Sequence, residues 1–228
     1  MSMHQAMVEQ IKILATALGK DLLDSVVFVG GCTTGIHVTD DYSRERIRHT
    51  EDIDLIISVQ LYTEWAGLLQ QLTKLGFSHP PMNEDHPNCR LFLGELMVDF
   101  MPIDEDVIGY SNPWYKDGMD TAVEHALDDG QVIKVLTTPY FLATKFEAFI
   151  GRGEGDYLGS KDIEDILAVI GGREEVVSDI KSAPQKLKEF LSSNFQTSLD
   201  ADYFHYAIQS IQGDLEEVIY DRINQIIQ

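Results

Sequence analysis

The sequence is poor in the residues that mark secreted or membrane proteins. It has only two cysteines, Cys32 and Cys89, without a Cys-x-x-Cys spacing, which excludes a disulfide framework and argues against a structural zinc site. No apolar run approaches the roughly 20 residues that a transmembrane helix needs. The first 20 residues have the pattern of an amphipathic helix and lack a signal-peptide cleavage site. We therefore expect a soluble, cytoplasmic protein that binds no membrane.

Basic residues are also scarce. The chain has 17 Lys and Arg against 38 Asp and Glu, which gives a formal net charge of −21. Such a chain repels a polyanion at long range, and this weakens an interpretation as a general nucleic-acid-binding protein. Basic residues gather in two places, the trio Arg44, Arg46 and Arg48 and the segment from Lys145 to Lys161. Each is either a solvated face or part of a local basic strip.

Hydrophobic residues make up 44% of the 228 residues, enough for one large domain or two small ones. Before residue 138 we expect four or five strands and two helices: strands in 25–29, 52–59 and 131–137, a hairpin in 89–103 turning near Gly94 and Glu95, and helices in 1–20 and 62–77. After it, helical patterns cover 139–152, 161–172, 183–195, 200–211 and 214–227. The chain is therefore predicted to be α/β (α+β), with a mixed-sheet domain in residues 1–137, a helical C-terminal domain in 138–228, and a site in a cleft between them.

Three acidic residues stand out because apolar strands surround them. Asp52 and Asp54 are two positions apart, so both side chains point to one face of their strand and repel each other unless a cation lies between them. Asp99 sits between Val98 and Phe100, where a charge is costly to bury unless it is paired or bound to metal. Three carboxylates on neighbouring strands would make an all-oxygen site for Mg²⁺.

The stretch "VFVGGCTTG" ends a strand on Gly30 and Gly31. A glycine pair lets the backbone approach a ligand closely, and a helix that follows it offers free N–H groups to an anion. Thr33 or Thr34 could add a hydroxyl donor. An ordinary turn explains the glycines as well, so the pair gains meaning only together with the three aspartates.

In this order the motifs resemble the DNA polymerase β-like nucleotidyltransferases. The later segment "TKFEAFIGRGEGDYLGSKDIEDI" is similar to the Lys…Arg…(Arg/Lys)-Asp-x-x-Asp pattern of the AbiEii/AbiGii toxin-type nucleotidyltransferases. The resemblance covers residues 26–168. It departs from the family in two ways: Cys32 follows the glycine pair where Ser or Thr is common, so Thr33 would have to supply the hydroxyl, and the gap from Gly31 to Asp52 is longer, which we interpret as an insertion carrying the arginine trio.

The resemblance implies transfer of a nucleoside monophosphate from a nucleoside triphosphate to an acceptor hydroxyl. Asp52 and Asp54 would hold Mg²⁺, and Asp99 would share a second metal ion or act as general base. Gly30, Gly31 and Thr33 would contact the nucleotide. Two further groups would come from the later segment, in which Lys145 and Arg152 would bind phosphates and Asp162, which shares a helix face with Asp165, would position the acceptor or pair with Lys145.

The family further implies a toxin of a toxin–antitoxin or phage-defence system, with tRNA or a protein as acceptor and a cognate antitoxin as partner. Within the same fold, a small cationic acceptor such as an aminoglycoside suits the acidic balance. Two other interpretations remain open: a non-catalytic nucleotide-binding partner protein, and an enzyme that uses Cys32 as nucleophile with His37 or His49 as its base. The aromatic residues Trp114, Tyr115, Tyr140 and Tyr157 fit either base stacking or the core.

Overall fold

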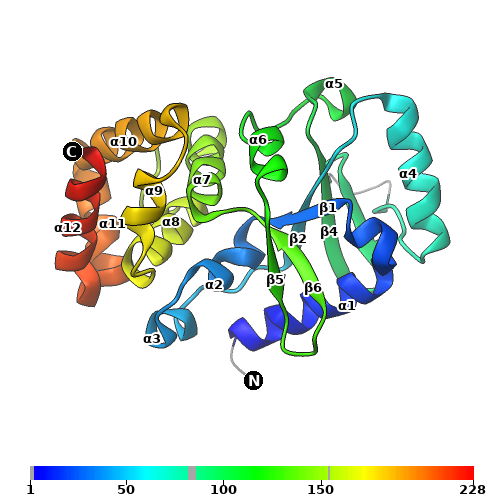
Figure 1. The fold of residues 1–228 in the computed structure, drawn as a ribbon, viewed down its shortest axis with the longest axis horizontal. Helices are drawn as coiled ribbons and strands as arrows, with labels where there is room; N and C mark the ends of the chain where they lie inside the picture. The colour runs from blue at the N-terminus through cyan, green and yellow to red at the C-terminus, as the bar shows by residue number, and fades with distance from the viewer. Residues whose placement is uncertain (1–2, 82–85, 154) are drawn as a thin grey trace. The chain divides into compact units, whose positions relative to one another are not determined.

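The computed structural model describes residues 3–81, 86–153 and 155–228 (Figure 1). Its contacts divide the chain into two compact units. Unit 1 comprises Met1–Thr33 and Arg48–Thr137, and unit 2 comprises Thr34–Ile47 and Thr138–Gln228. No helix within the described ranges is long and apolar enough to cross a membrane.

The described part of unit 1 is built on a six-stranded mixed sheet with the order β3-β4-β2-β1-β6-β5. The strands are β1 (Val26–Val29), β2 (Asp52–Ile57), β3 (Arg90–Leu93), β4 (Leu96–Pro102), β5 (Val123–Ala126) and β6 (Val132–Val135). The β1/β6 and β2/β4 pairs are parallel, and the other three pairs are antiparallel. The protein is therefore an α/β protein with a mixed sheet, as the sequence predicts.

The strands that the sequence predicts from apolar β-branched runs are present in the structure. The sequence analysis did not predict β5. β5 pairs with β6 at the edge of the sheet. Its residues are mostly exposed, so it lacks the apolar run or alternation by which a half-buried strand is recognised. The helices of unit 1 are α1 (Met3–Leu23), α4 (Tyr62–Lys74), α5 (Glu105–Ile108) and α6 (Tyr115–Asp120), of which α1 packs on β1 and α5 on β4.

Unit 2 is helical (Figure 1). Its helices are α2 (Thr34–His37), α3 (Asp41–Glu45), α7 (Thr138–Arg152), α8 (Lys161–Gly172), α9 (Val176–Lys181), α10 (Gln185–Leu199), α11 (Asp202–Gln212) and α12 (Glu216–Ile227). Phe146 of α7 and Phe195 of α10 pack edge to face at 4.8 Å, and both are fully buried. Ser160 caps α8 by accepting a hydrogen bond from the Ile163 N–H.

Residues 34–47 belong to unit 2, although the sequence analysis assigned them to a domain spanning 1–137. The backbone N–H groups of Thr39 and Asp40 both donate to the carbonyl of Gly172 at the end of α8. A side chain at Gly172 would collide with Val38 and Ser43, so the segment packs directly on this glycine. These are backbone and glycine contacts, which leave little trace in a hydrophobic pattern.

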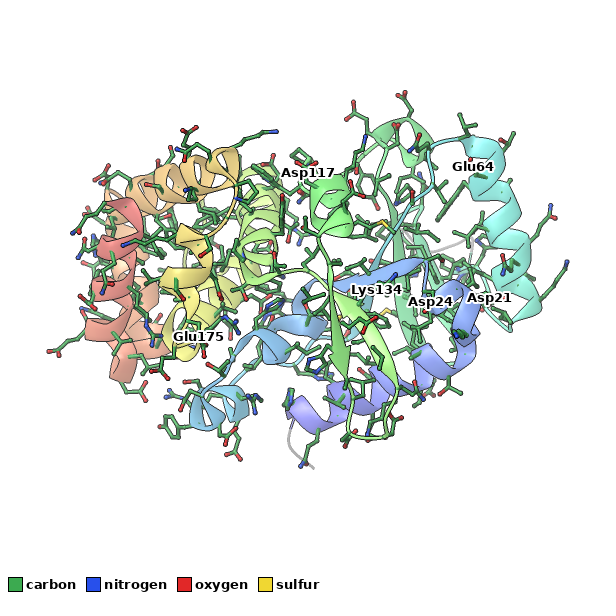
Figure 2. All side chains as sticks on the ribbon, viewed as in Figure 1. Asp21, Asp24, Glu64, Asp117, Lys134 and Glu175 are labelled. Atoms are coloured by element: carbon green, nitrogen blue, oxygen red, sulfur yellow. The ribbon has the colours of Figure 1, made fainter. Side chains whose placement is uncertain are left out.

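The acidic excess is spread over the surface. Asp21 on α1, Glu64 on α4 and Asp117 on α6 are exposed, and they project from the helices of unit 1 (Figure 2). Glu175 is likewise exposed in unit 2. Carboxylates in water need no partner, so these residues account for net charge without implying a site.

Candidate functional site

The structure brings the three aspartates of unit 1 together on adjacent strands. Asp52 and Asp54 are half-buried on β2 and alternate with the buried Ile53, so they share a face of the sheet. β4 runs parallel to β2, and its Asp99 is the register partner of Asp54. Asp99 is 6% exposed, which makes it the most deeply buried of the three.

A basic residue that the sequence analysis did not single out lies beside this group. Arg90 on β3 is the antiparallel register partner of Asp99. Its Nε and Nη2 donate to the two carboxylate oxygens of Asp99 across 2.8 and 2.7 Å, and Nη2 also donates to Oδ2 of Asp52 across 2.8 Å. The hydrogen bond with Asp99 raises the pKa of Arg90 above its ordinary value, so the guanidinium stays charged.

Two further contacts fix the aspartates of β2. The hydroxyl of Thr50 donates to Oδ1 of Asp52 across 2.8 Å. The α-carbon of Gly30 faces Asp54 so closely that a Cβ there would collide with the carboxylate. Gly30 also has a φ of 70°, in the left-handed region that favours glycine. The first glycine of the pair is therefore required both by its conformation and by Asp54.

The residues after the glycines form a short 3-10 turn, Gly31–Thr33. Thr33 is fully buried, and its hydroxyl donates to the carbonyl of Gly30 across 3.0 Å. Cys32 is buried too and directs its thiol to the carbonyl of Val29 at 2.9 Å. In this arrangement both side chains stabilise the turn. The Thr33 hydroxyl, which we expected to donate to a phosphate, donates to the Gly30 carbonyl instead.

The arginine trio is divided between the units. Arg48, in unit 1, lies over Gly31, where a Cβ would meet its Nη2 at 2.6 Å. Arg44 and Arg46 belong to unit 2, and both bind groups of the same unit. Arg44 donates to the Val38 carbonyl through Nε and Nη2, and Arg46 pairs with Asp214 at 2.5 Å.

The predicted residues of the later segment form a charged cluster inside unit 2. Lys145 is 5% exposed on α7, and its Nζ lies 3.2 Å from Asp162 and 2.6 Å from Asp165 on α8. Arg152, two turns after Lys145, also binds Asp162, with its Nη2 3.1 Å from Oδ2. The predicted pairing of Asp162 with Lys145 is confirmed. Lys145 is thus surrounded by protein, whereas the Arg152 side chain is 74% exposed.

Most of the aromatic residues that could have stacked on a base lie in the core. Trp114, Tyr115 and Tyr140 are each less than 9% exposed. Tyr157 packs between Phe149 and Phe204, with ring centroids at 4.7 and 5.4 Å. Glu154, three positions before Tyr157, lies outside the described residues.

The cysteines have the environment of structural rather than reactive thiols. Cys89 is 1% exposed and its Sγ lies 2.7 Å from the Tyr110 hydroxyl. Burial, with a contribution from the charge of Asp99, raises the pKa of the Cys89 thiol to about 12. His37, a suggested base for Cys32, is in unit 2, where it contacts the Thr138 hydroxyl and packs on Phe141 at 4.3 Å.

Within residues 3–81, 86–153 and 155–228, no three His, Cys, Asp or Glu side chains are grouped as a metal site. Arg90 and Thr50 are the site residues that the sequence analysis missed. Thr50 lies two positions before Asp52, to which its hydroxyl donates, and Arg90 could have been found from the hairpin register. No family model matches the chain, and no curated protein matches it either.

Proposed function

We propose that the protein is a Mg²⁺-dependent nucleotidyltransferase of the AbiEii/AbiGii type, which transfers a nucleoside monophosphate from a nucleoside triphosphate to an acceptor hydroxyl. The observation that carries the proposal is the carboxylate row of unit 1, in which Asp52 and Asp54 share a face of β2 and Asp99 lies beside Asp54 on β4. Grouping like charges on strands that are otherwise apolar costs stability, and a cationic ligand offsets that cost.

The donor chemistry of Asp52 and Asp54 fits Mg²⁺. Both are half-buried carboxylates, and the Thr50 hydroxyl orients Asp52 while leaving lone pairs on its oxygens. Carboxylate oxygens are the ligands that Mg²⁺ prefers, with water and phosphate oxygens completing the shell. When bound, the ion would supply positive charge against the triphosphate and lower the pKa of the attacking hydroxyl.

The chain's own residues would position the nucleotide. Because Gly30 and Gly31 have no side chains, the Asp54 carboxylate and the Arg48 guanidinium both lie against this backbone, where the phosphates of the nucleotide would bind. Arg48, whose guanidinium lies over Gly31, would contact that phosphate. Asp99 accepts two hydrogen bonds from Arg90, which favours a positioning role for it over that of a general base.

The resemblance also assigns Lys145, Arg152 and Asp162 to the reaction. Lys145 is buried between two carboxylates, so it holds α7 and α8 together. Arg152 is the exposed member of the cluster and shares Asp162 with Lys145. We therefore assign phosphate binding in this segment to Arg152, with Asp162 and Lys145 as the residues that fix its orientation.

Two arguments bear on the class of acceptor, the family resemblance and the negative net charge of the chain. A toxin with tRNA or a protein as its target, neutralised by an antitoxin, is the function that the resemblance implies. The exposed acidic residues favour a cationic acceptor, and this makes an aminoglycoside-like small molecule the alternative acceptor.

A second candidate is a nucleotide-binding protein without turnover. It is favoured by Arg90, because this guanidinium pairs with both Asp52 and Asp99 and offsets one of their two negative charges. The two candidates differ in their products, since an inactive protein binds nucleoside triphosphate but releases no pyrophosphate.

The test is label transfer. The purified protein is incubated with Mg²⁺, each nucleoside triphosphate labelled at the α-phosphate, and total cellular RNA or protein, with aminoglycosides as further acceptors. We expect one acceptor to be labelled from the α-phosphate and none from the γ-phosphate, which distinguishes nucleotidyl from phosphoryl transfer. Asp54→Asn should abolish labelling, because it removes a metal ligand without changing the size of the side chain.

Asp106→Asn is the matched control, since Asp106 is an exposed residue of unit 1 in a second Asp-x-Asp sequence outside the sheet. It should label the acceptor like the wild type. Undiminished labelling by Asp54→Asn would contradict the site assignment. Nucleotide binding without label transfer or pyrophosphate release would favour the non-catalytic candidate.

A further inference from the structure

Arg90 occupies the space between the carboxylates of two neighbouring strands. A single nitrogen, Nη2, lies 2.7 Å from Oδ2 of Asp99 and 2.8 Å from Oδ2 of Asp52. Nε completes a two-pronged contact with Asp99 through Oδ1. Both oxygens of Asp99 and one of Asp52 therefore already accept hydrogen bonds from a fixed positive charge.

The backbone holds this guanidinium in place. Arg90 and Asp99 are directly opposite each other in the β3/β4 hairpin, so the arginine is as fixed in register as the aspartate. The Arg90 side chain is 16% exposed and that of Asp99 is 9% exposed. Pairs with two parallel charge-assisted hydrogen bonds are among the strongest that side chains make, and arginine does not lose its proton in proteins. Withdrawing Arg90 would leave Asp99 buried and unpaired.

A divalent ion that used Asp52 and Asp99 together would need the same space. Two cations within about 4 Å repel strongly at the low effective dielectric of a half-buried site. The carboxylate of Asp54 lies against the Gly30 backbone. An ion held by Asp52 and Asp54 would leave the two hydrogen bonds of Arg90 with Asp99 in place.

We propose that Arg90 takes the place of a second metal ion between Asp52 and Asp99, so that the site binds one divalent cation, at Asp52 and Asp54. This inference rests on the proposed function, because it concerns the same site. Asp99 is then a positioning residue that acts through Arg90 and orients Asp52. The pairing would also keep the carboxylates in place before the nucleotide and its metal arrive.

The experiment counts bound Mn²⁺, a substitute for Mg²⁺ that is visible by electron paramagnetic resonance. Titrations are made in high salt, which screens diffuse binding to the acidic surface. We expect one tightly bound ion in the wild type, two in Arg90→Met and one in Arg90→Lys, which keeps a positive charge beside Asp99. Asp106→Asn, whose acidic residue lies outside the site, should bind as many ions as the wild type.

Arg90→Met leaves Asp99 without its partner, so a double variant guards against a failure to fold. Arg90→Met with Asp99→Asn removes both charges of the pair and should bind one ion. Two ions in the wild type, or no additional ion in a folded Arg90→Met, would overturn the inference and leave the nucleotidyltransferase proposal standing. No Mn²⁺ bound by the wild type or by any variant would overturn both.

Discussion

The ammonium group of Lys145 lies 2.6 Å from the carboxylate of Asp165, and both side chains are almost completely buried. Their helices, α7 and α8, pack against each other in unit 2. Asp162 adds a second carboxylate to the same lysine at 3.2 Å and joins it to the exposed Arg152. One face of α8 therefore supplies two negative charges to a single buried cation, and the phosphate binding that we propose for this segment is left to the exposed Arg152.

Lys145→Met should strongly destabilise the protein, because it leaves Asp165, 1% exposed, as a buried charge with one partner fewer. Breaking a buried ion pair by removing one partner costs about 3–5 kcal/mol. Urea unfolding followed by circular dichroism measures the loss. The matched variant Lys161→Met, at the exposed start of α8, should change the free energy of unfolding by less than about 0.5 kcal/mol. Equal effects of the two variants would contradict the assignment of Lys145 to a stabilising role.

Arg152→Ala separates stability from phosphate binding. The arginine side chain is 74% exposed, and exposed ion pairs contribute about 1 kcal/mol or less, so the free energy of unfolding should change little. If Arg152 binds the triphosphate, however, the KM for the nucleotide should rise at least about tenfold, as expected for the loss of a two-pronged phosphate contact. Steady-state kinetics over a range of nucleotide concentrations measures this. An unchanged KM would remove the later segment from the nucleotide site.

The hairpin shows how much of the site could be predicted from the sequence. Its two apolar arms and the turn at Gly94 and Glu95 were predicted, and that turn alone pairs each residue with the one equally far from it on the other arm. Arg90 and Asp99 are such a pair. The prediction stopped at the three acidic residues because a lone arginine next to Cys89 has no pattern of its own, and its meaning comes only from the register.

Other features could not be predicted from local patterns. The attachment of residues 34–47 to unit 2 depends on backbone donors that meet the Gly172 carbonyl, more than 130 positions away. The burial of Lys145 depends on which face of α7 meets α8, and helical spacing leaves that choice open. The pairing of Asp162 with Lys145, in contrast, was one of the two roles that the family resemblance implied for this aspartate.

Neither cysteine should behave as a nucleophile. The Cys89 thiol has its pKa raised to about 12, so at pH 8 it is almost entirely protonated, and Cys32 is buried with its hydrogen directed to the Val29 carbonyl. We expect the native protein to react negligibly with a disulfide reagent at pH 8 and to expose two reactive thiols once it is unfolded in urea. Cys32→Ala should retain label transfer. Fast reaction of one thiol together with loss of activity would revive the cysteine mechanism.

Gly30→Ala should disable the carboxylate site through Asp54. A left-handed φ costs an alanine about 1–2 kcal/mol, and at Gly30 the new methyl group would also collide with the Asp54 carboxylate. Gly109 provides the control, because its backbone is left-handed, with φ 90° and ψ 0°, but a Cβ there meets no atom within 4 Å. Gly109→Ala therefore reports a left-handed backbone cost without a collision. We expect both variants to lose stability in urea unfolding, Gly30→Ala by more, and only Gly30→Ala to lose Mn²⁺ binding and label transfer. If Gly30→Ala bound Mn²⁺ as tightly as Gly109→Ala, Asp54 would not be a ligand in the position that the structure gives it.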